Sequence, residues 1–422
     1  MTLILSLILF GLSAIMLFFA GCRLWVMHIA KQSIQGSDLH MLKWCVQEQT
    51  RAWAGFHITF TDDAPYQDIK EEMIRNITHD LKSPQSNYRR GMDLAEQQYV
   101  FYKHYSIEDI ICQTVHDKEF FKLSDQNNKE LVYKFHDGRQ LVGALFDHTV
   151  WDGIRMFNET LSPAIKSKPF ESRWLLGDRY IPIFSECFML YALSVMGIRW
   201  FSHTPLTKLA DQSEQKLLRH SFKKQKITAL KQRSQTKFTA ALLATWANRL
   251  FHSAALSRNK LRFGLVVGMN NPRFRNNYSL MIIDVHRQNI EAQAQEIKKQ
   301  MRSRAIEVMP TYHLLSLVEM QSALKKTMVD CLFSPGIFEP DTGPSQYAKE
   351  LFLYIVPTSM PIYSFACSLG EQITISTTWN SPEIDLDHLS SDAAALYTQG
   401  ESEVLKIVFE SEKQFQDHHK AE

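Results

Sequence analysis

The sequence predicts an α/β protein built of two halves and preceded by one membrane-spanning helix. At 422 residues the chain is too long for one ordinary compact core. After residue 58, short apolar runs typical of strands alternate with stretches of helical periodicity. The first 22 residues contain no charged side chain. We expect an anchor over 1–30, halves over 58–205 and 236–422, and a crossover over 206–235.

The N-terminal segment is long enough to cross a bilayer. At ~1.5 Å per residue, its apolar residues 1–22 span roughly the 30 Å hydrocarbon core. Nothing basic precedes the apolar run, which favours an uncleaved anchor over a signal peptide. Arg23 and Lys31 follow it, with Trp25 at the expected interface, so the positive-inside tendency places the body in the cytoplasm.

Two other interpretations of this segment stay open. The residues Phe19-Ala20-Gly21-Cys22 resemble a bacterial lipoprotein cleavage site, which would leave a lipidated Cys22 on an exported protein, although the basic leader of such proteins is missing. The segment could also be a buried helix of a soluble protein, although charge-free runs of this length seldom serve that purpose.

Composition excludes several functional classes. The chain is 45% hydrophobic and 22% charged, as in an ordinary globular enzyme. Its net charge of +2 gives no global footprint for nucleic acid, so we expect none to bind. The six cysteines form no metal-binding pattern and are expected to be reduced thiols. No nucleophile elbow, phosphate-binding glycine loop or dinucleotide fingerprint is present, so we expect no bound metal or cofactor.

The first half is expected to contain a hairpin that ends in a histidine. The Asp137-Gly138 turn signal separates strands expected at 131–135 and 141–146. The second strand is almost entirely apolar, as in the interior of a sheet, and leads directly into Asp147 and His148.

Two further stretches each allow two interpretations. Residues 184–201 are apolar, but Glu186 and Arg199 leave too few uncharged residues to cross a bilayer, so the stretch either lies on the membrane or packs as a buried helix. From 202 to 237 the chain is polar and basic. This crossover is either a solvated surface or a basic rim for phosphates of coenzyme A or for anionic lipid headgroups. Its cations are Lys216, Arg219, Lys223, Lys224, Lys226, Lys231 and Arg233.

The second half also mixes helices and strands. Apolar residues recur at helical spacing over 236–251, and an apolar strand over 261–269 runs into an Asn- and Pro-rich loop at 270–277. Further elements are expected as a helix over 292–308, strands over 351–357, 362–368 and 372–378, and mostly helix over 386–412.

One motif carries chemistry, the hexapeptide His148-Thr149-Val150-Trp151-Asp152-Gly153. A histidine at the end of a buried strand is held by its neighbours and can point a ring nitrogen into a cleft. A chance His-x-x-x-Asp-Gly is expected in on the order of a few per cent of such sequences. The alternative is a surface-turn histidine, as at His136-Asp137-Gly138; His286 is expected to be an exposed strand residue.

The hexapeptide resembles the HxxxDG motif of the chloramphenicol acetyltransferase-like superfamily. That superfamily includes coenzyme A acyltransferases, peptide-synthetase condensation domains and wax ester synthase/diacylglycerol acyltransferases. The resemblance implies two similar α/β halves with a tunnel between them and His148 at its middle. The wax ester synthase branch looks nearest, because helix 236–251 is followed by a strand and an Asn-rich loop, and because Thr358-Ser359-Met360-Pro361-Ile362-Tyr363 resembles a degenerate Ser-Asn-Val-Pro-Gly-Pro segment.

The sequence departs from this superfamily at two points. Many members carry two histidines in tandem, and here Asp147 occupies the first of the two positions. The Asp-Phe-Gly-Trp-Gly motif of the plant branch is absent, which disfavours that branch.

The resemblance implies a role for each motif residue. His148 would act as general base, taking a proton from the acceptor as it attacks an acyl thioester and returning the proton to the departing thiol. Asp152 would be structural and pair with Arg273 or Arg275. Gly153 would keep the tunnel open beside the histidine.

The oxyanion of the tetrahedral intermediate also needs a hydrogen-bond donor. Candidates at expected strand ends of the second half are Thr358, Ser359 and Asn380.

These features predict a membrane-anchored acyltransferase that moves an acyl group from acyl-CoA to a hydroxyl of a hydrophobic or lipid-like acceptor. Acyl-CoA would be a co-substrate rather than a bound cofactor. Tethering to the bilayer would raise the local concentration of a bilayer-dissolved acceptor. Two alternatives stay open: a condensation-type enzyme that uses a carrier-protein thioester with an amine or hydroxyl acceptor, and a non-catalytic member of the fold.

Overall fold

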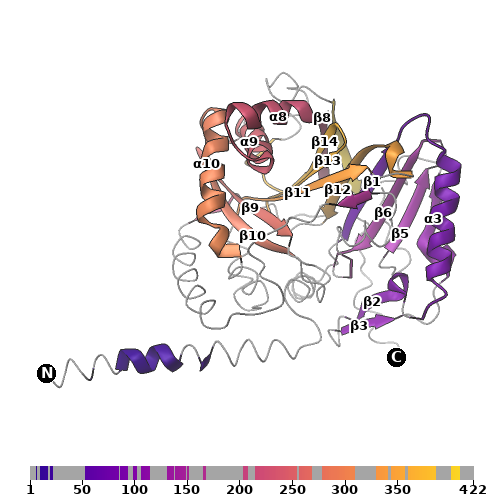
Figure 1. The fold of residues 1–422 in the computed structure, drawn as a ribbon, viewed down its shortest axis with the longest axis horizontal. Coiled ribbons are helices and arrows are strands. Elements are labelled where there is room, and N and C mark those ends of the chain that lie inside the picture. The colour runs from indigo at the N-terminus through magenta and orange to yellow at the C-terminus, as the bar shows by residue number, and fades with distance from the viewer. Residues whose placement is uncertain are drawn as a thin grey trace.

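The computed structural model shows two large β-sheets with their helices, and a separate two-stranded ribbon (Figure 1). All structural statements below concern the residues that the structure describes, which are 6, 10–17, 20–21, 53–84, 86–93, 98–101, 106–114, 131–136, 138–148, 150–151, 165–167, 203–207, 214–253, 256–268, 278–308, 329–340, 344–356, 360–385 and 401–408.

The first sheet has the strand order β12-β1-β6-β5-β4. Its strands are β1 (Trp53–Phe60), β4 (Ile111–Thr114), β5 (Leu131–His136), β6 (Leu141–Asp147) and β12 (Ala348–Val356). Neighbours pair antiparallel except β4 and β5, which pair parallel. The short α4 (Ile107–Ile110) precedes β4, and β2 (Arg90–Asp93) and β3 (Gln98–Phe101) form a separate ribbon.

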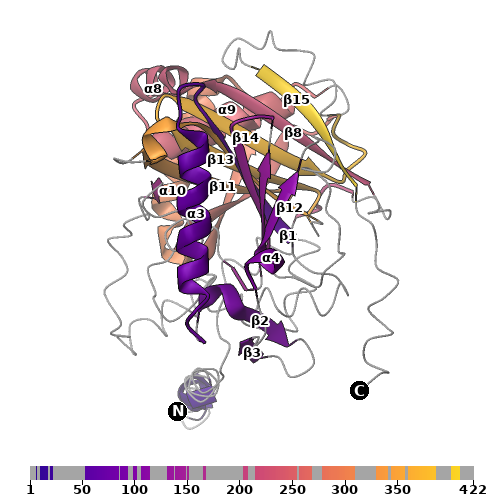
Figure 2. The ribbon, with the colours of Figure 1, turned by 90° about the vertical axis from the view of Figure 1, so that its right-hand side faces the viewer.

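Helix α3 (Tyr66–Asp80) covers one face of the first sheet (Figure 2). Its residues Ile69, Met73 and Ile77 recur every four positions, so they form one apolar stripe that is buried in the core of this half. Strand β6 is buried along its whole length because β1 and β5 flank it on both sides. Its apolar composition thus follows from its central place in the sheet.

The second sheet has the order β10-β9-β11-β13-β14-β8-β15, with β7 (Ile165–Ser167) paired to β11. Its other strands are β8 (Glu214–Lys223), β9 (Lys260–Gly268), β10 (Tyr278–His286), β11 (Cys331–Pro340), β13 (Ile362–Leu369), β14 (Gln372–Trp379) and β15 (Glu401–Val408). Three short 3-10 helices, η1 (Asn87–Arg89), η2 (Ala305–Glu307) and η3 (Pro344–Tyr347), lie in the connections.

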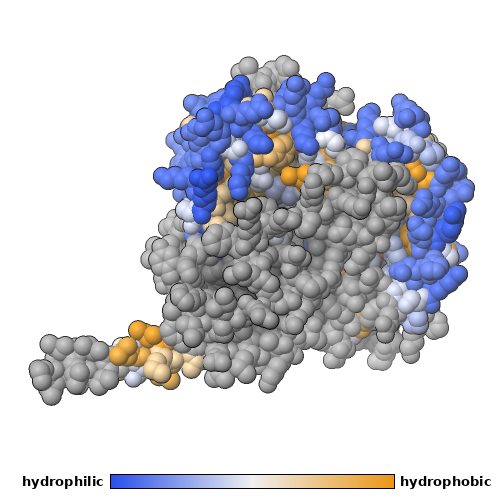
Figure 3. Space-filling view, viewed as in Figure 1, coloured by the Kyte–Doolittle hydropathy of each residue, from blue (hydrophilic) through white to orange (hydrophobic). Residues whose placement is uncertain are grey.

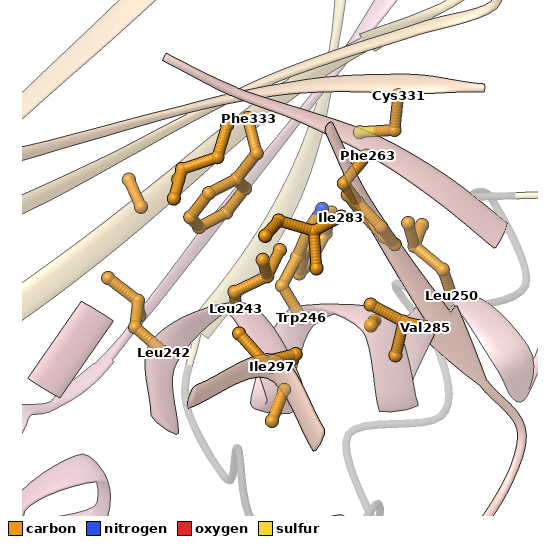
Figure 4. Close-up of a cluster of buried hydrophobic side chains, with 14 of the residues drawn as sticks. Leu242, Leu243, Trp246, Leu250, Phe263, Ile283, Val285, Ile297, Cys331 and Phe333 are labelled. Atoms are coloured by element: carbon orange, nitrogen blue, oxygen red, sulfur yellow. The ribbon is translucent and has the colours of Figure 1, made fainter. Parts of the chain in front are cut away.

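Three helices lie together on the second half: α8 (Lys224–Arg233), α9 (Phe238–Phe251) and α10 (Ile290–Ser303) (Figure 1). Trp246 of α9 is fully buried among Phe263, Ile283 and Phe333 of the sheet (Figure 4). Its indole Nε1 donates a hydrogen bond to Ser364 Oγ on β13 at 2.9 Å. The core of the second half therefore lies between α9 and the sheet.

Strand β12 links the two halves. It pairs with β1 from Trp53↔Val356 to Phe60↔Ala348, although it belongs to the second half in sequence. Glu350 on β12 accepts a hydrogen bond from Thr374 Oγ1 on β14 at 2.9 Å and also binds Arg219 and Ser221 of β8. Strand β12 thus completes the first sheet by backbone pairing, and its side chain Glu350 binds side chains of the second sheet.

Most of the expected elements are present. The strands expected at 131–135, 141–146, 261–269, 362–368 and 372–378 correspond to β5, β6, β9, β13 and β14, and the helices at 236–251 and 292–308 correspond to α9 and α10 with η2. The strand expected at 351–357 exists as β12, and His286 is exposed at the end of β10 as expected.

Three expectations differ from the structure. Helix was expected over most of 386–412, but the described part of that stretch, 401–408, forms β15. Its pairing with β8 supplies backbone partners that an isolated sequence pattern does not reveal. Within the crossover expected at 206–235, residues 214–233 form β8 and α8 and are part of the second half. The first half was expected from residue 58, but β1 already begins at Trp53.

Near the N-terminus the structure describes a helix over 10–17. Its large apolar side chains are 52–76% exposed, and Figure 3 shows them as a hydrophobic surface; they are Phe10, Leu12, Ile15, Met16 and Leu17. Among the described residues, no helix is both long and apolar enough to span a membrane. Most of the anchor expected over 1–30, and all of 184–201, lie outside the described residues.

Candidate functional site

His148 follows the central strand of the first sheet directly. Asp147, the last residue of β6, is 3% exposed and pairs across the sheet with Trp53 of β1. His148 itself is half-buried, and its ring lies 6.2 Å from that of Phe146. The histidine therefore directly follows a buried strand, as the sequence predicted, and part of its side chain is accessible.

The chain turns tightly after His148. The backbone N–H groups of Val150 and Trp151 both donate to the carbonyl oxygen of Asp147 at 3.0 Å. Val150 is fully buried and Trp151 is 1% exposed, with its ring centroid 6.0 Å from that of Tyr88. The backbone on both sides of His148 is thus anchored, which restricts the orientations that the imidazole can take.

Strands of the second half end beside His148. Trp53 pairs with Asp147 on one side and with Val356 of β12 on the other. With neighbouring strands about 4.8 Å apart, the ends of β6 and β12 are separated by roughly 10 Å. The carbonyl oxygen of Ile355 accepts a hydrogen bond from Thr378 Oγ1 on β14 at 3.3 Å, so β14 ends at the same edge.

Asn380 is the one oxyanion candidate among the described residues. It follows β14, is 5% exposed, and its backbone N–H donates to the carbonyl oxygen of Pro361 at 2.8 Å. The register described above brings it to the edge where β6 ends. The other candidates lie outside the described residues, namely Asp152, Gly153, Arg273, Arg275, Thr358 and Ser359.

A second histidine, His57, lies inside the first sheet and pairs with Gly143 in the middle of β6. It is 1% exposed in the middle of β1, its ring packs edge-on against Phe352 at 4.6 Å, and its Nε2 lies 3.4 Å from Tyr354 Oη. Burial holds the pKa of His57 well below its usual range, and the charges of Lys134 and Arg219 lower it further. The imidazole is therefore neutral and belongs to the junction of β1 and β12.

Sequence reasoning missed His57 because its strand was not expected to begin at Trp53. The signal that could have found it is the run Trp53–Phe60 itself, in which a single histidine stands among apolar and β-branched residues. Such a pattern indicates a histidine buried in a sheet rather than one on a surface.

We expect stability to fall below about pH 6.5 because the unfolded state binds a proton that folded His57 does not. The folded pKa is depressed, so this stability is present above the unfolded pKa and is lost as pH falls toward the folded pKa. The slope for one proton is about 1.4 kcal/mol per pH unit. Urea unfolding between pH 5 and about 8 measures it. His57→Gln should remove this slope, whereas His286→Ala, which removes an exposed histidine, should keep it; an unchanged slope in His57→Gln would contradict the assignment.

Within the described residues, no group of three or more His, Cys, Asp or Glu side chains could hold a metal ion.

Comparison with solved structures identifies the fold. The chain resembles the wax ester synthase/diacylglycerol acyltransferase from Marinobacter aquaeolei VT8 with a TM-score of 0.54 at 12% identity, over 82% of this chain and 93% of that one. It resembles the TRI3 trichothecene 15-O-acetyltransferase from Fusarium sporotrichioides with a TM-score of 0.58 at 11% identity, over 82% and 90%. The EpoB cyclization-docking bidomain from Sorangium cellulosum gives a TM-score of 0.51 at 11% identity, over 83% and 80%. The chain has the chloramphenicol acetyltransferase-like fold.

In this chloramphenicol acetyltransferase-like fold, the two sheets are the two lobes and β12 joins them. The likeness is one of structure, since no family model matches the sequence and no curated protein sequence matches it. The identities of 11–12% show the fold alone. The chemistry must therefore be argued from the residues of this chain.

Proposed function

We propose that the protein is an acyltransferase in which His148 is the general base. The observation that carries this proposal is the place of His148 in an intact His-x-x-x-Asp-Gly spacing. It follows the central strand of one lobe and is half-buried. It lies where β12 of the same sheet ends and where β14 of the other lobe ends. A base between two lobes can meet an acceptor and an acyl donor that approach from different sides.

The chemistry at this site is a nucleophilic exchange of one acyl bond for another. A ring nitrogen of neutral His148 accepts the proton of the acceptor hydroxyl as its oxygen attacks the thioester carbonyl. The tetrahedral intermediate collapses with cleavage of the carbon–sulfur bond, and the imidazolium returns the proton to the thiolate. An amide N–H of Asn380, or a donor at Thr358 or Ser359, would stabilise the oxyanion. Asp152 with Arg273 or Arg275 would shape the turn, and Gly153 would leave room beside the histidine.

The proposed donor is acyl-CoA, and the proposed acceptor is a hydrophobic or lipid-like alcohol. The names of two similar structures describe transfer to oxygen, namely a wax ester synthase/diacylglycerol acyltransferase and a 15-O-acetyltransferase. The charge-free residues 1–22 support a single-pass anchor, and Arg23 and Lys31 support a cytoplasmic body. An anchored enzyme would meet acceptors that are dissolved in the bilayer.

A second candidate is a condensation-type enzyme that takes its acyl group from a carrier protein and accepts an amine or a hydroxyl. The similarity to the EpoB cyclization-docking bidomain supports it. The two candidates differ in the leaving group, because acyl-CoA releases free coenzyme A whereas a carrier retains its thiol.

The proposed function is tested by thiol release from a panel of acyl-CoA donors with long-chain alcohols and diacylglycerol as acceptors, in detergent. We expect release that depends on the acceptor and an ester product that mass spectrometry detects. Release without acceptor would indicate a thioesterase instead. Absence of release with every acyl-CoA, together with transfer from an acylated carrier protein, would favour the condensation-type reaction.

A further inference from the structure

A long stretch of the second half carries basic residues without acidic ones. No Asp or Glu occurs between Glu214 and Asp284. The last residue of β8, helix α8 and the turn after it contribute Lys223, Lys224, Lys226, Lys231, Arg233 and Lys237 from this stretch. The net charge of the whole chain is only +2, so it does not reveal this local excess of positive charge.

The fold gathers these cations with others on one surface. Helices α8 and α10 both contact α9 and lie beside each other on the second half (Figure 1). Lys298 of α10 donates from Nζ to the carbonyl oxygen of Gln235 at 2.5 Å, which joins α10 to the turn after α8. We call the exposed cations of this surface the basic helical face. They are Lys231, Arg233, Lys237, Lys299 and Arg302.

Few carboxylates offset this charge. Glu291 lies 3.7 Å from Arg233 across an exposed pair, which is weak in water. Glu296, in the middle of α10, is engaged by His286 and Gln288 at 2.6 and 2.8 Å. The hydrophilic surface over α8 and α10 in Figure 3 therefore carries an excess of positive charge.

The basic helical face is on the opposite side of the second sheet from β12. Ser364 and Thr377 share one face of that sheet, where Ser364 accepts a hydrogen bond from Trp246 of α9. Ser376 and Thr378 share the other face and donate to backbone carbonyls of β12. A sheet and a helix layer, roughly 20 Å in all, thus separate the face from the edge near His148. The face is not part of the site that binds the reacting thioester.

We propose that the basic helical face binds the anionic headgroups of a lipid bilayer and so docks the body on the membrane. The inference rests on the proposed function, in which the acceptor is dissolved in the bilayer. Five flexible cations, from α8, the turn after it and α10, suit a surface of many dispersed anions, because each can reach its own headgroup. If extended, residues 22–52 could span up to roughly 100 Å, so the N-terminal segment alone does not determine which face of the body meets the lipid.

The proposal is tested by vesicle flotation of the full chain, with phosphatidylcholine vesicles compared against vesicles that also contain phosphatidylglycerol. The apolar N-terminal segment contributes equally to binding of both kinds of vesicle. The additional binding to vesicles with phosphatidylglycerol therefore measures the electrostatic contact alone. We expect wild type to gain at least about tenfold in binding, with the gain decreasing as salt is added. The variant Lys231→Glu/Arg233→Glu/Lys237→Glu should lose the gain.

A charge-matched control reverses three exposed cations of the first half, Arg75→Glu/Lys82→Glu/Arg139→Glu, and should keep the gain. The proposal would be overturned if both variants lost the additional binding to anionic vesicles equally, or if wild type showed no such additional binding. The second result would favour an acidic protein as the partner. Thiol release in detergent with a soluble alcohol should be the same in the triple variant Lys231→Glu/Arg233→Glu/Lys237→Glu and in wild type. Loss of the anionic gain with thiol release intact therefore tests the face separately from the proposed function.

Discussion

Replacing His148 with alanine should lower acceptor-dependent thiol release by roughly 10²–10⁴-fold, the usual contribution of a positioned general base. Histidine is the side chain that most often serves as a general base, and the imidazole of His148 directly follows the central strand of its lobe. Without it, the acceptor hydroxyl keeps its proton and attacks the thioester slowly. Because the loss is in proton transfer, we expect it in kcat more than in KM.

Controls separate this effect from unfolding. His148 is half-buried and lies beyond the last paired residue of β6, so His148→Ala should leave the urea midpoint nearly unchanged. His286→Ala removes an exposed histidine on β10 and should retain wild-type release. Undiminished release in His148→Ala would remove this residue from the mechanism. Loss of release together with a large drop in stability would leave its catalytic role without support.

The local part of this site could be predicted from sequence because its signals are local. The apolar run 141–146 requires burial on both faces, and such a strand must lie inside a sheet. The histidine directly after it was therefore expected where a central strand of the sheet ends. The same holds for α9, where apolar residues at helical spacing predicted the buried stripe that contains Trp246.

The remainder depends on which strands pair, and pairing is not encoded by periodicity. Nothing in the composition of β12 distinguishes a strand of the second sheet from one that completes the first. Strand β15 alternates polar and apolar residues weakly and is a strand because β8 is available beside it. The buried network around Glu350 follows from the same long-range pairing and left no local signal.

Replacing Glu350 with alanine should destabilise the protein by about 3–5 kcal/mol, as expected when one partner of a buried ion pair is removed. Glu350 is 7% exposed and binds Arg219, Ser221 and Thr374. The substitution takes the carboxylate from a guanidinium whose side chain is 26% exposed and from two buried hydroxyl groups. The guanidinium and the two hydroxyl groups would then lack the hydrogen bonds that compensate for their removal from water. Denaturant unfolding measures the loss as a change in the free energy of unfolding.

Activity at His148 should decrease together with stability. Strand β12 pairs with β1, and β1 pairs with the end of β6 that precedes His148. We therefore expect Glu350→Ala to lose thiol release even at temperatures where most of the protein is folded. Glu371→Ala, at an exposed carboxylate, should change stability by no more than about 0.5 kcal/mol and keep the activity. Equal stability of Glu350→Ala and Glu371→Ala would show that the β12 junction does not depend on this carboxylate. If Glu350→Ala were unstable but fully active in its folded fraction, the junction would support the fold without positioning His148.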